Sequence, residues 1–321
     1  MQVNVMYHGN CFDGCASAAV FGRYAQEKLG AAKDDIRYQP LKHRQGGPFA
    51  GVSFEADVTA CLDLPYHALF HWWFDNHHTP FRLPGDRYAF QRDLMRSQKF
   101  WDPTVASCTG LLVRTLTGRF GWSAGAFAEL VRWADVVGAS RFDSARAALS
   151  LEEPALRAMA LLEGTKDAEV PTRLIEAMQR STLAEIAEEG WFGTALVPVV
   201  EERVAVAKEI RDRAQASDGV VAIDLGDTPF EVASRYLPFD LVPEARYAVM
   251  LVCDPQRARL SVGSNPWAEG ERSQDLARLC ARHDGGGRPG DSAVMFPREQ
   301  LAEARRVFAE IAGTLREART S

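Results

Sequence analysis

Histidine and aspartate residues follow three apolar stretches of the chain, and their types fit a site for divalent metal ions. The first stretch runs into His8 and Asp13, the second closes at Asp63, and the third meets the run Asp75-Asn76-His77-His78. Carboxylate oxygens mixed with imidazole nitrogens, without a cluster of thiolates, favour Mn²⁺ or a similar ion over structural zinc. A carboxylate such as Asp63 can bridge two ions, and two ions about 3.5 to 4 Å apart can activate water and stabilise a phosphoryl displacement.

Each of these residues also has an ordinary structural interpretation when it is taken alone. Asp13 could cap a helix N-terminus, and Asp63, two residues before Pro65, could belong to a turn. The adjacent pair His77 and His78 could lie in a solvated loop. Their joint occurrence at the ends of successive strand-like stretches is what favours the metal site.

Short buried strands must position these side chains. Apolar runs of strand length cover Val3–Tyr7, Val58–Leu62 and Ala68–Phe74, and a helical spacing of apolar and small residues covers Ala16–Leu29. Strands mixed with helices in this order predict an α/β fold with a mostly parallel sheet. Because ligands bind such sheets outside the carboxyl ends of the strands, the candidate residues are expected to converge.

Helices dominate the next part of the chain. The pattern predicts helices over Cys108–Leu116 and over Ala124–Val137, the second with Ser123 as its N-cap. Asp135, near the end of the second helix, is a further candidate metal ligand. From about Ser144 to Glu189 the pattern is almost wholly helical, with interruptions at Gly164-Thr165 and Val170-Pro171.

A charged helix predicted over Val200–Ala214 separates this region from a second α/β region. The second region has strands predicted at Val220–Leu225, Tyr247–Cys253 and Arg259–Val262, and helices at Arg272–Ala281 and Glu299–Leu315. We therefore expect a metal-binding catalytic domain over residues 1–195, a linker helix over 196–216 and a smaller substrate-binding domain over 217–321.

The overall composition is that of an ordinary folded protein. Of the 321 residues, 46% are hydrophobic and 25% are charged. The net charge of −6 argues against binding of long duplex DNA, which requires many Lys and Arg contacts to phosphates. A short nucleotide could still be held by a metal pair and a few local donors.

The chain shows no sign of a membrane or secreted protein. No apolar run approaches the roughly 18 to 20 residues that cross a bilayer, and the first residues do not resemble a signal peptide. The six cysteines include no CxxC pair, so reduced thiols are expected. A cytoplasmic location is the expectation.

These blocks resemble the DHH phosphoesterase superfamily, which includes oligoribonucleases (nano-RNases), single-strand exonucleases and related pyrophosphatases. The resemblance spans nearly the whole chain. It is carried by the segment from His8 to Ala18 with Asp13, Gly14 and Ser17, by Asp63, by Asp75-Asn76-His77-His78, by Asp135 and by Gly285-Gly286-Gly287-Arg288-Pro289-Gly290.

The resemblance implies a role for each matched residue. His8 and Asp63 would bind one metal ion, whereas Asp13, Asp63, His77 and Asp135 would bind the other. His78 would face the substrate phosphate. Asp75 would orient a metal ligand through a hydrogen bond, which fixes the tautomer and direction of an imidazole.

Two positions depart from the pattern of the superfamily. The first motif usually offers two aspartates separated by one residue, and here the first of them is Cys11, with His8 slightly offset. Cys11 could be a thiolate ligand for a softer ion such as zinc or iron, or it could be a bystander that leaves one metal site weaker. The third motif carries Asn76 as an additional residue, which should shift the loop without removing a ligand.

The glycines at Gly285–Gly287 permit close backbone approach and positive φ angles. Alone they indicate only a helix end and a turn, but the resemblance places a phosphate-binding loop here. Arg288 stands where the superfamily normally has histidine, and its fork of donors suits phosphate. Ser264 and Asn265 could add hydrogen bonds to the ligand.

These inferences predict a phosphodiesterase that cleaves short single-stranded oligonucleotides or dinucleotides with a metal-activated water in a cleft between the domains. Asp63, His78 and Arg288 are the expected catalytic residues, and two divalent ions, favoured to be Mn²⁺, are the expected cofactors. One alternative is a phosphatase for small compounds such as a nucleoside bisphosphate or polyphosphate. Another is a noncatalytic nucleotide sensor that has lost one metal ion, as Cys11 suggests.

Overall fold

Two mixed α/β units make up the computed structural model, which describes residues 1–42, 47–93, 98–231, 233–268 and 273–318. Unit 1 comprises residues 1–141 and 152–196, and unit 2 comprises residues 142–151 and 197–321. The division between them falls inside helix α9 (Gly190–Arg213). In the part of the chain that is described, no helix is both long enough and apolar enough to cross a membrane.

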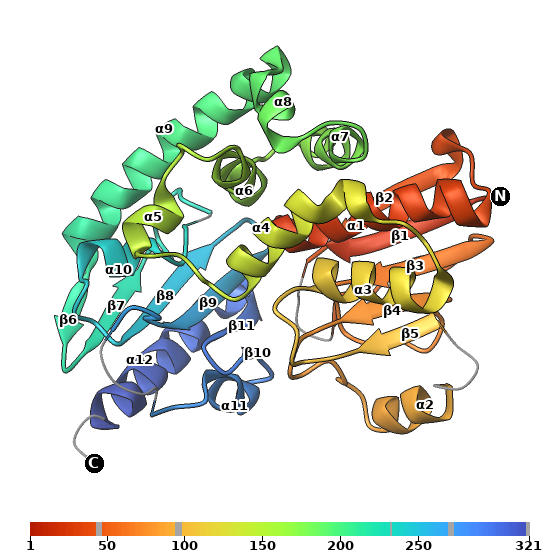
Figure 1. Cartoon of the computed structure of the whole chain (residues 1–321). Coiled ribbons are helices and arrows are strands. Elements are labelled where there is room, and N and C mark those ends of the chain that lie inside the picture. The colour runs from red at the N-terminus through yellow and green to blue at the C-terminus, as the bar shows by residue number, and fades with distance from the viewer. Residues whose placement is uncertain (43–46, 94–97, 232, 269–272, 319–321) are drawn as a thin grey trace. The chain divides into compact units, whose positions relative to one another are not determined.

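A parallel five-stranded sheet organises unit 1, as the sequence predicts. Its strand order is β2-β1-β3-β4-β5 (Figure 1). The strands are β1 (Val3–His8), β2 (Ile36–Leu41), β3 (Val58–Leu62), β4 (Trp72–Asp75) and β5 (Gln98–Trp101). The bounds of β3 match the prediction, whereas β4 is shorter than Ala68–Phe74, because Phe70 N donates to His67 O in a turn before it.

The strands that the sequence analysis missed, β2 and β5, lie at the two edges of this sheet. Edge strands tolerate polar residues and proline because one side of the backbone is not paired within the sheet. Strand β2 accordingly contains Arg37, Gln39 and Pro40, and β5 begins with Gln98-Lys99. Neither has the apolar or alternating pattern by which the central strands could be recognised.

Helix α1 (Phe12–Tyr24) begins four residues before the predicted start and continues as a π-helical turn over Ala25–Leu29. A Cβ atom on Gly14 would lie 2.1 Å from the carbonyl oxygen of His8. Only glycine allows the first turn of α1 to approach the end of β1 so closely. This contact places the side chains at the start of α1 next to the carboxyl end of the sheet.

Two predicted helix boundaries in unit 1 are wrong. Helix α4 (Ala128–Gly138) is not capped by Ser123, because a 3-10 turn over Gly125–Phe127 precedes it. Val170-Pro171 does not interrupt a helix but lies in the first turn of α7 (Glu169–Met178), where the missing N–H of proline costs no helical hydrogen bond.

Four further helices lie where the sequence predicts helical structure. They are α3 (Cys108–Phe120), which is four residues longer than predicted, α6 (Pro154–Gly164) and α8 (Leu183–Glu188) in unit 1, and α5 (Ala145–Leu149) in unit 2. Helix α2 (Asp86–Asp93) of unit 1 was not predicted.

Unit 2 is built on a six-stranded sheet of order β10-β11-β9-β8-β7-β6, in which only β7 and β8 pair in parallel among the described strands. Its strands are β6 (Gln215–Ser217), β7 (Val220–Asp224), β8 (Tyr247–Cys253), β9 (Arg257–Ser264), β10 (Gly286–Arg288) and β11 (Asp291–Pro297). Besides α5, its helices are α10 (Leu237–Leu241), α11 (Leu276–Ala281) and α12 (Leu301–Glu317), with the second part of α9. Arg272, the predicted start of α11, lies outside the described residues.

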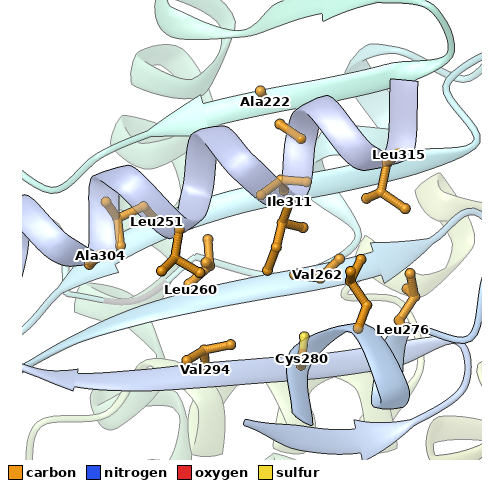
Figure 2. Packing of buried hydrophobic residues seen from close by; sticks show 14 of the residues in the cluster. Ala222, Leu251, Leu260, Val262, Leu276, Cys280, Val294, Ala304, Ile311 and Leu315 are labelled. Atoms are coloured by element: carbon orange, nitrogen blue, oxygen red, sulfur yellow. The ribbon is translucent and has the colours of Figure 1, made fainter. Parts of the chain in front are cut away.

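Successive side chains of β8 point to opposite faces of the sheet in unit 2, and each face has its own hydrophobic cluster. Tyr247, Val249, Leu251 and Cys253 pack in one cluster with α12, which lies along the sheet in Figure 2. The residues between them pack in a second cluster with Val206 and Ile210 of α9 and with α10. A strand that is apolar on both faces needs cover on both sides, and the helices provide it.

Candidate metal centre

Asp63 lies directly after the central strand β3, between the ends of the neighbouring strands β1 and β4. Its backbone has φ of 58°, a left-handed conformation that non-glycine residues seldom adopt and that aspartate tolerates better than most. Its amide donates to Phe74 O of β4 at 3.0 Å. The strained backbone therefore holds a carboxylate that is only 2% exposed at the edge of the sheet.

One oxygen of Asp63 faces two side chains from the segment that follows β1. His8 Nδ1 lies 3.2 Å from Asp63 Oδ2, and Cys11 Sγ lies 3.7 Å from the same oxygen. The three donor atoms lie within 4.8 Å of one another. Burial and the negative charge of Asp63 raise the pKa of the Cys11 thiol, while the backbone N–H groups of Gly14 and Asp13 oppose the shift.

The other oxygen of Asp63 faces a second group of donors at the end of β4. His77 Nδ1 lies 3.7 Å from Asp63 Oδ1 and 2.7 Å from Asp75 Oδ1. Asp75 Oδ1 also accepts from the backbone N–H of His77 at 3.2 Å. Asp63 thus presents one oxygen to each of two donor groups, which is the arrangement expected of a carboxylate that bridges two ions.

The carboxylate of Asp13, a residue of the first turn of α1, contacts the N-terminus of α3. Its Oδ2 accepts from Cys108 N at 2.8 Å, and its Oδ1 accepts from Thr109 N at 2.9 Å and from Thr109 Oγ1 at 2.7 Å. Burial and the charge of Asp63 raise the pKa of Asp13 to about 6, although the donors from Thr109 and Cys108 act in the opposite direction. The carboxylate is therefore close enough to Asp63 for the two charges to repel each other.

Asp135 approaches the same end of α3 from helix α4. Its Oδ1 accepts from Ser107 Oγ at 2.5 Å, and Ser107 caps α3 by accepting from Gly110 N at 2.9 Å. A Cβ atom on Gly110 would lie 3.0 Å from Asp135 Oδ1, so glycine leaves room for the carboxylate. Within the described residues, Asp13 and Asp135 belong to neither group of closely spaced donors around Asp63.

Ser107 and Thr109, which donate to the carboxylates of Asp135 and Asp13, were not among the predicted site residues. A serine before a helical stretch is a recognisable N-cap signal and could have identified the helix start. The partners of the two hydroxyl groups could not be recognised, because Asp13 and Thr109 are 96 positions apart in the chain.

The donor set fits divalent metal ions. The carboxylates of Asp13, Asp63 and Asp75 are 3%, 2% and 0% exposed, and several negative charges brought so close together in a buried site repel each other. Asp75 Oδ2 is buried and has no hydrogen-bond partner in the part of the chain that the structure describes. A cation would offset this charge and coordinate to the carboxylates, the imidazoles and the thiol.

His78 is exposed beside the half-buried His77. It follows the second donor group directly in the chain, so its imidazole is accessible to a molecule in solvent. Asn76, the additional residue of the motif, is buried, and its Nδ2 donates to Val105 O at 3.1 Å. This hydrogen bond fixes the loop between β4 and the two histidines.

The glycines of unit 2 form part of a β-hairpin. Gly286–Arg288 is strand β10, which pairs with β11 so that Arg288 lies opposite Asp291. A Cβ atom on Gly285 would lie 2.5 Å from Ala293 O. Gly287 has φ of 149°, and a Cβ atom there would lie 2.5 Å from Asp291 O. Tight packing of the hairpin therefore requires these glycines, whether or not they contact a phosphate.

Ser264 and Asn265 support the turn after β9. Ser264 Oγ donates to Gly290 O at 3.0 Å. The buried Asn265 side chain donates to Pro243 O and Ala245 O and accepts from Trp267 N, so its polar atoms already have partners inside unit 2. Trp267 packs on Tyr236 and belongs to the core of this unit.

No protein-family model and no curated protein sequence matches the chain. Among solved structures, the chain is similar to the pGpG-specific phosphodiesterase PggH from Vibrio cholerae, with a TM-score of 0.64 and 14% identity over 99% of this chain and 100% of that chain. It is also similar to RecJ in complex with Mn²⁺ from Thermus thermophilus, with a TM-score of 0.52 and 16% identity. That match covers 98% of this chain but only 52% of RecJ, so the chain spans about half of RecJ.

These likenesses establish the fold. The chain has the fold of the DHH-type proteins among its structural neighbours, which confirms the predicted fold class and the resemblance stated from the motifs.

Proposed function

We propose that this chain is a metal-dependent phosphoesterase that hydrolyses the phosphodiester bond of short oligonucleotides or dinucleotides. The observation that carries the proposal is the position of Asp63, whose two oxygens face the separate donor groups of His8 with Cys11 and of His77 with Asp75. The shared fold with a pGpG-specific phosphodiesterase and with Mn²⁺-bound RecJ supports it.

In this proposal the donor groups on either side of Asp63 hold two divalent ions, with Mn²⁺ favoured where the ligands are oxygen and nitrogen. Such ions lower the pKa of water toward about 7 and neutralise charge on phosphoryl oxygens. Asp75 Oδ1 lies 2.7 Å from His77 Nδ1 and thereby fixes the direction of the imidazole beside Asp63. Asp13 and Asp135, which accept hydrogen bonds from Cys108 and Ser107 at the start of α3, would add further negative charge for the ions to offset.

Two further residues are proposed to act on the substrate. The exposed imidazole of His78 donates a hydrogen bond to a phosphoryl oxygen as negative charge develops there. Arg288, with the hairpin glycines Gly285–Gly287 beside it, binds a phosphate of the nucleotide through its planar fork of donors. The net charge of −6 favours a short substrate, because a long one would require many additional cationic contacts.

A noncatalytic nucleotide sensor is the second candidate, and the presence of Cys11 beside Asp63 favours it. A thiol in place of a carboxylate would weaken binding of a hard ion on one side of the centre. The sensor would bind nucleotide with one metal ion and without turnover.

A substrate panel tests the proposal. Metal-free protein is reconstituted with Mn²⁺ and incubated with pGpG, with oligonucleotides of two to five residues, with cyclic dinucleotides, with a nucleoside bisphosphate and with inorganic polyphosphate. We expect the fastest release of mononucleotides from the linear dinucleotide. Faster release of phosphate from the last two compounds would instead identify a small-molecule phosphatase, and nucleotide binding without turnover under any divalent ion would identify the sensor.

A further inference from the structure

We propose that Cys11 is a metal ligand, so that the two sides of the centre differ in the ion that they select. His8, Cys11 and Asp63 would form a nitrogen, sulfur and oxygen site for a borderline ion such as Zn²⁺ or Fe²⁺. The group of Asp63, Asp75 and His77 would take a harder ion such as Mn²⁺. This inference rests on the proposed metal centre but not on the identity of the substrate.

The spacing of the three donor atoms is that of ligands around one ion. For metal distances of about 2.3 Å to sulfur and about 2.0 to 2.2 Å to nitrogen and oxygen, tetrahedral coordination separates nitrogen from oxygen by about 3.4 Å and sulfur from oxygen by about 3.6 Å. The structure has 3.2 Å between His8 Nδ1 and Asp63 Oδ2, and 3.7 Å between Cys11 Sγ and the same oxygen. Both distances agree with this geometry to within a few tenths of an ångström.

Hydrogen bonding explains these contacts less well. An N–H···O bond is usually about 2.9 to 3.0 Å long, so the contact of His8 with Asp63 is longer than most. The thiol is a weak donor, and its contact with the same oxygen adds little binding energy. The convergence of the three donor atoms on one point is the arrangement expected around an ion.

Cys11 differs from the other cysteines of the chain in its surroundings. It is partly exposed, whereas the other five are buried. Cys61 Sγ contacts Pro65 O and Cys108 Sγ contacts Phe74 O, so these buried thiols face backbone carbonyls. Cys11 instead is the N-cap residue of α1, and its Sγ faces the carboxylate of Asp63.

The donor types on the two sides of Asp63 predict different selectivity. A thiolate favours zinc or iron over manganese, since it is a softer ligand than a carboxylate. The group of Asp75 and His77 has only oxygen and nitrogen atoms, which suit Mn²⁺. Asp63 would belong to both sites, and occupation of one would affect the affinity of the other.

Cobalt absorption spectroscopy tests the inference directly. Metal-free full-length protein is titrated with Co²⁺, and we expect a near-ultraviolet charge-transfer band from thiolate to Co²⁺. The band should be lost in Cys11→Ser and in Cys11→Asp, and it should persist in the control Cys253→Ser, whose thiol lies in unit 2. In competition experiments, Cys11→Asp should shift the preference from Zn²⁺ toward Mn²⁺ by tenfold or more.

The outcomes separate this inference from the proposed function, because hydrolysis of the linear dinucleotide with Mn²⁺ is measured on the same samples. Hydrolysis by the wild type together with Co²⁺ binding that shows no thiolate band would overturn the role of Cys11 alone. A band that persists in both Cys11 variants, or no binding of Co²⁺ at all, would also overturn it. A band that depends on Cys11, without hydrolysis under any divalent ion, would support the site and contradict the phosphoesterase.

Discussion

His77 Nδ1 lies 2.7 Å from Asp75 Oδ1, and the two residues are separated by one position at the end of β4. The same carboxylate oxygen accepts from the backbone N–H of His77, so Asp75 holds both the ring and the loop. A histidine held in this way has a defined tautomer and direction, which is how carboxylates support metal-binding imidazoles in many proteins. The side chain of His77, the proposed ligand, is therefore held in a fixed direction.

Replacement of this carboxylate should weaken metal binding without unfolding the protein. In Asp75→Asn, the amide is a poorer acceptor for the ring N–H, and we expect affinity for Mn²⁺ to fall by about 10- to 100-fold. Isothermal titration calorimetry measures the change. The exposed Asp34→Asn on the same unit is the matched control and should bind like the wild type. Unchanged affinity in Asp75→Asn would exclude the orienting role.

The hydrogen bond from the Thr109 hydroxyl to the Asp13 carboxylate should stabilise the folded state. The substitution Thr109→Val keeps the shape of the side chain but removes the hydroxyl that donates to Asp13 Oδ1 at 2.7 Å. Because a buried carboxylate loses a donor, we expect the free energy of unfolding to fall by about 1 to 3 kcal/mol. Urea denaturation of the metal-free protein measures it, with the exposed Thr117→Val on the same helix as the control. Equal losses in the two variants would contradict the assignment.

Gly14 should be essential for the junction between β1 and α1. A methyl group at this position would lie 2.1 Å from His8 O, so Gly14→Ala must displace the helix start that carries Cys11 and Asp13. We expect a loss of several kcal/mol in unfolding free energy, beyond the usual ~1 to 3 kcal/mol of overpacking, together with weaker Mn²⁺ binding.

The control for Gly14 is Gly118→Ala in helix α3, where a Cβ atom would meet no atom within 4 Å. Alanine is favoured over glycine in a helix, so this variant should gain about 0.5 to 1 kcal/mol. Thermal and urea unfolding of both proteins gives the comparison. A Gly14→Ala protein as stable as the wild type would show that the start of α1 can move freely.

Arg288 should affect substrate affinity and leave metal binding unchanged. In Arg288→Ala, we expect KM for the linear dinucleotide to rise by about tenfold or more, since a charge-assisted contact to phosphate contributes about 1.5 to 3 kcal/mol. Steady-state kinetics and Mn²⁺ titration are measured in parallel. The exposed Arg282→Ala, at the end of α11, is the control for loss of positive charge. The same KM in both variants would remove Arg288 from the proposed site.

The meeting of Asp63, Asp75 and His77 could be predicted from sequence because parallel strands place their carboxyl ends on one edge of a sheet. That rule requires only the order of the strands and the polar residues after them. The edge strands β2 and β5 could not be predicted in the same way, since their polar residues hide the strand pattern. The α/β class could still be recognised, because the central strands are continuous apolar runs.

Contacts between residues that are far apart in the sequence could not be predicted from it. Nothing local indicates that Asp13 reaches the N-terminus of α3 or that Asp135 contacts Ser107, because both depend on how α1, α3 and α4 pack. The glycines near Gly287 indicated close approach of the backbone to a ligand, and in the structure they allow two strands to approach each other closely. Local patterns thus predict the elements better than the contacts that the elements make.

Metal-dependent hydrolysis by Asp63→Asn is the measurement that tests the central claim most directly. The release of mononucleotides from a linear dinucleotide is followed with saturating Mn²⁺ in the wild type, in Asp63→Asn and in Asp34→Asn. We expect Asp63→Asn to lose activity by about a hundredfold or more, as for other groups that stabilise charge in a transition state, while Asp34→Asn remains active. Turnover by Asp63→Asn at the rate of the wild type would contradict a metal centre bridged by this carboxylate.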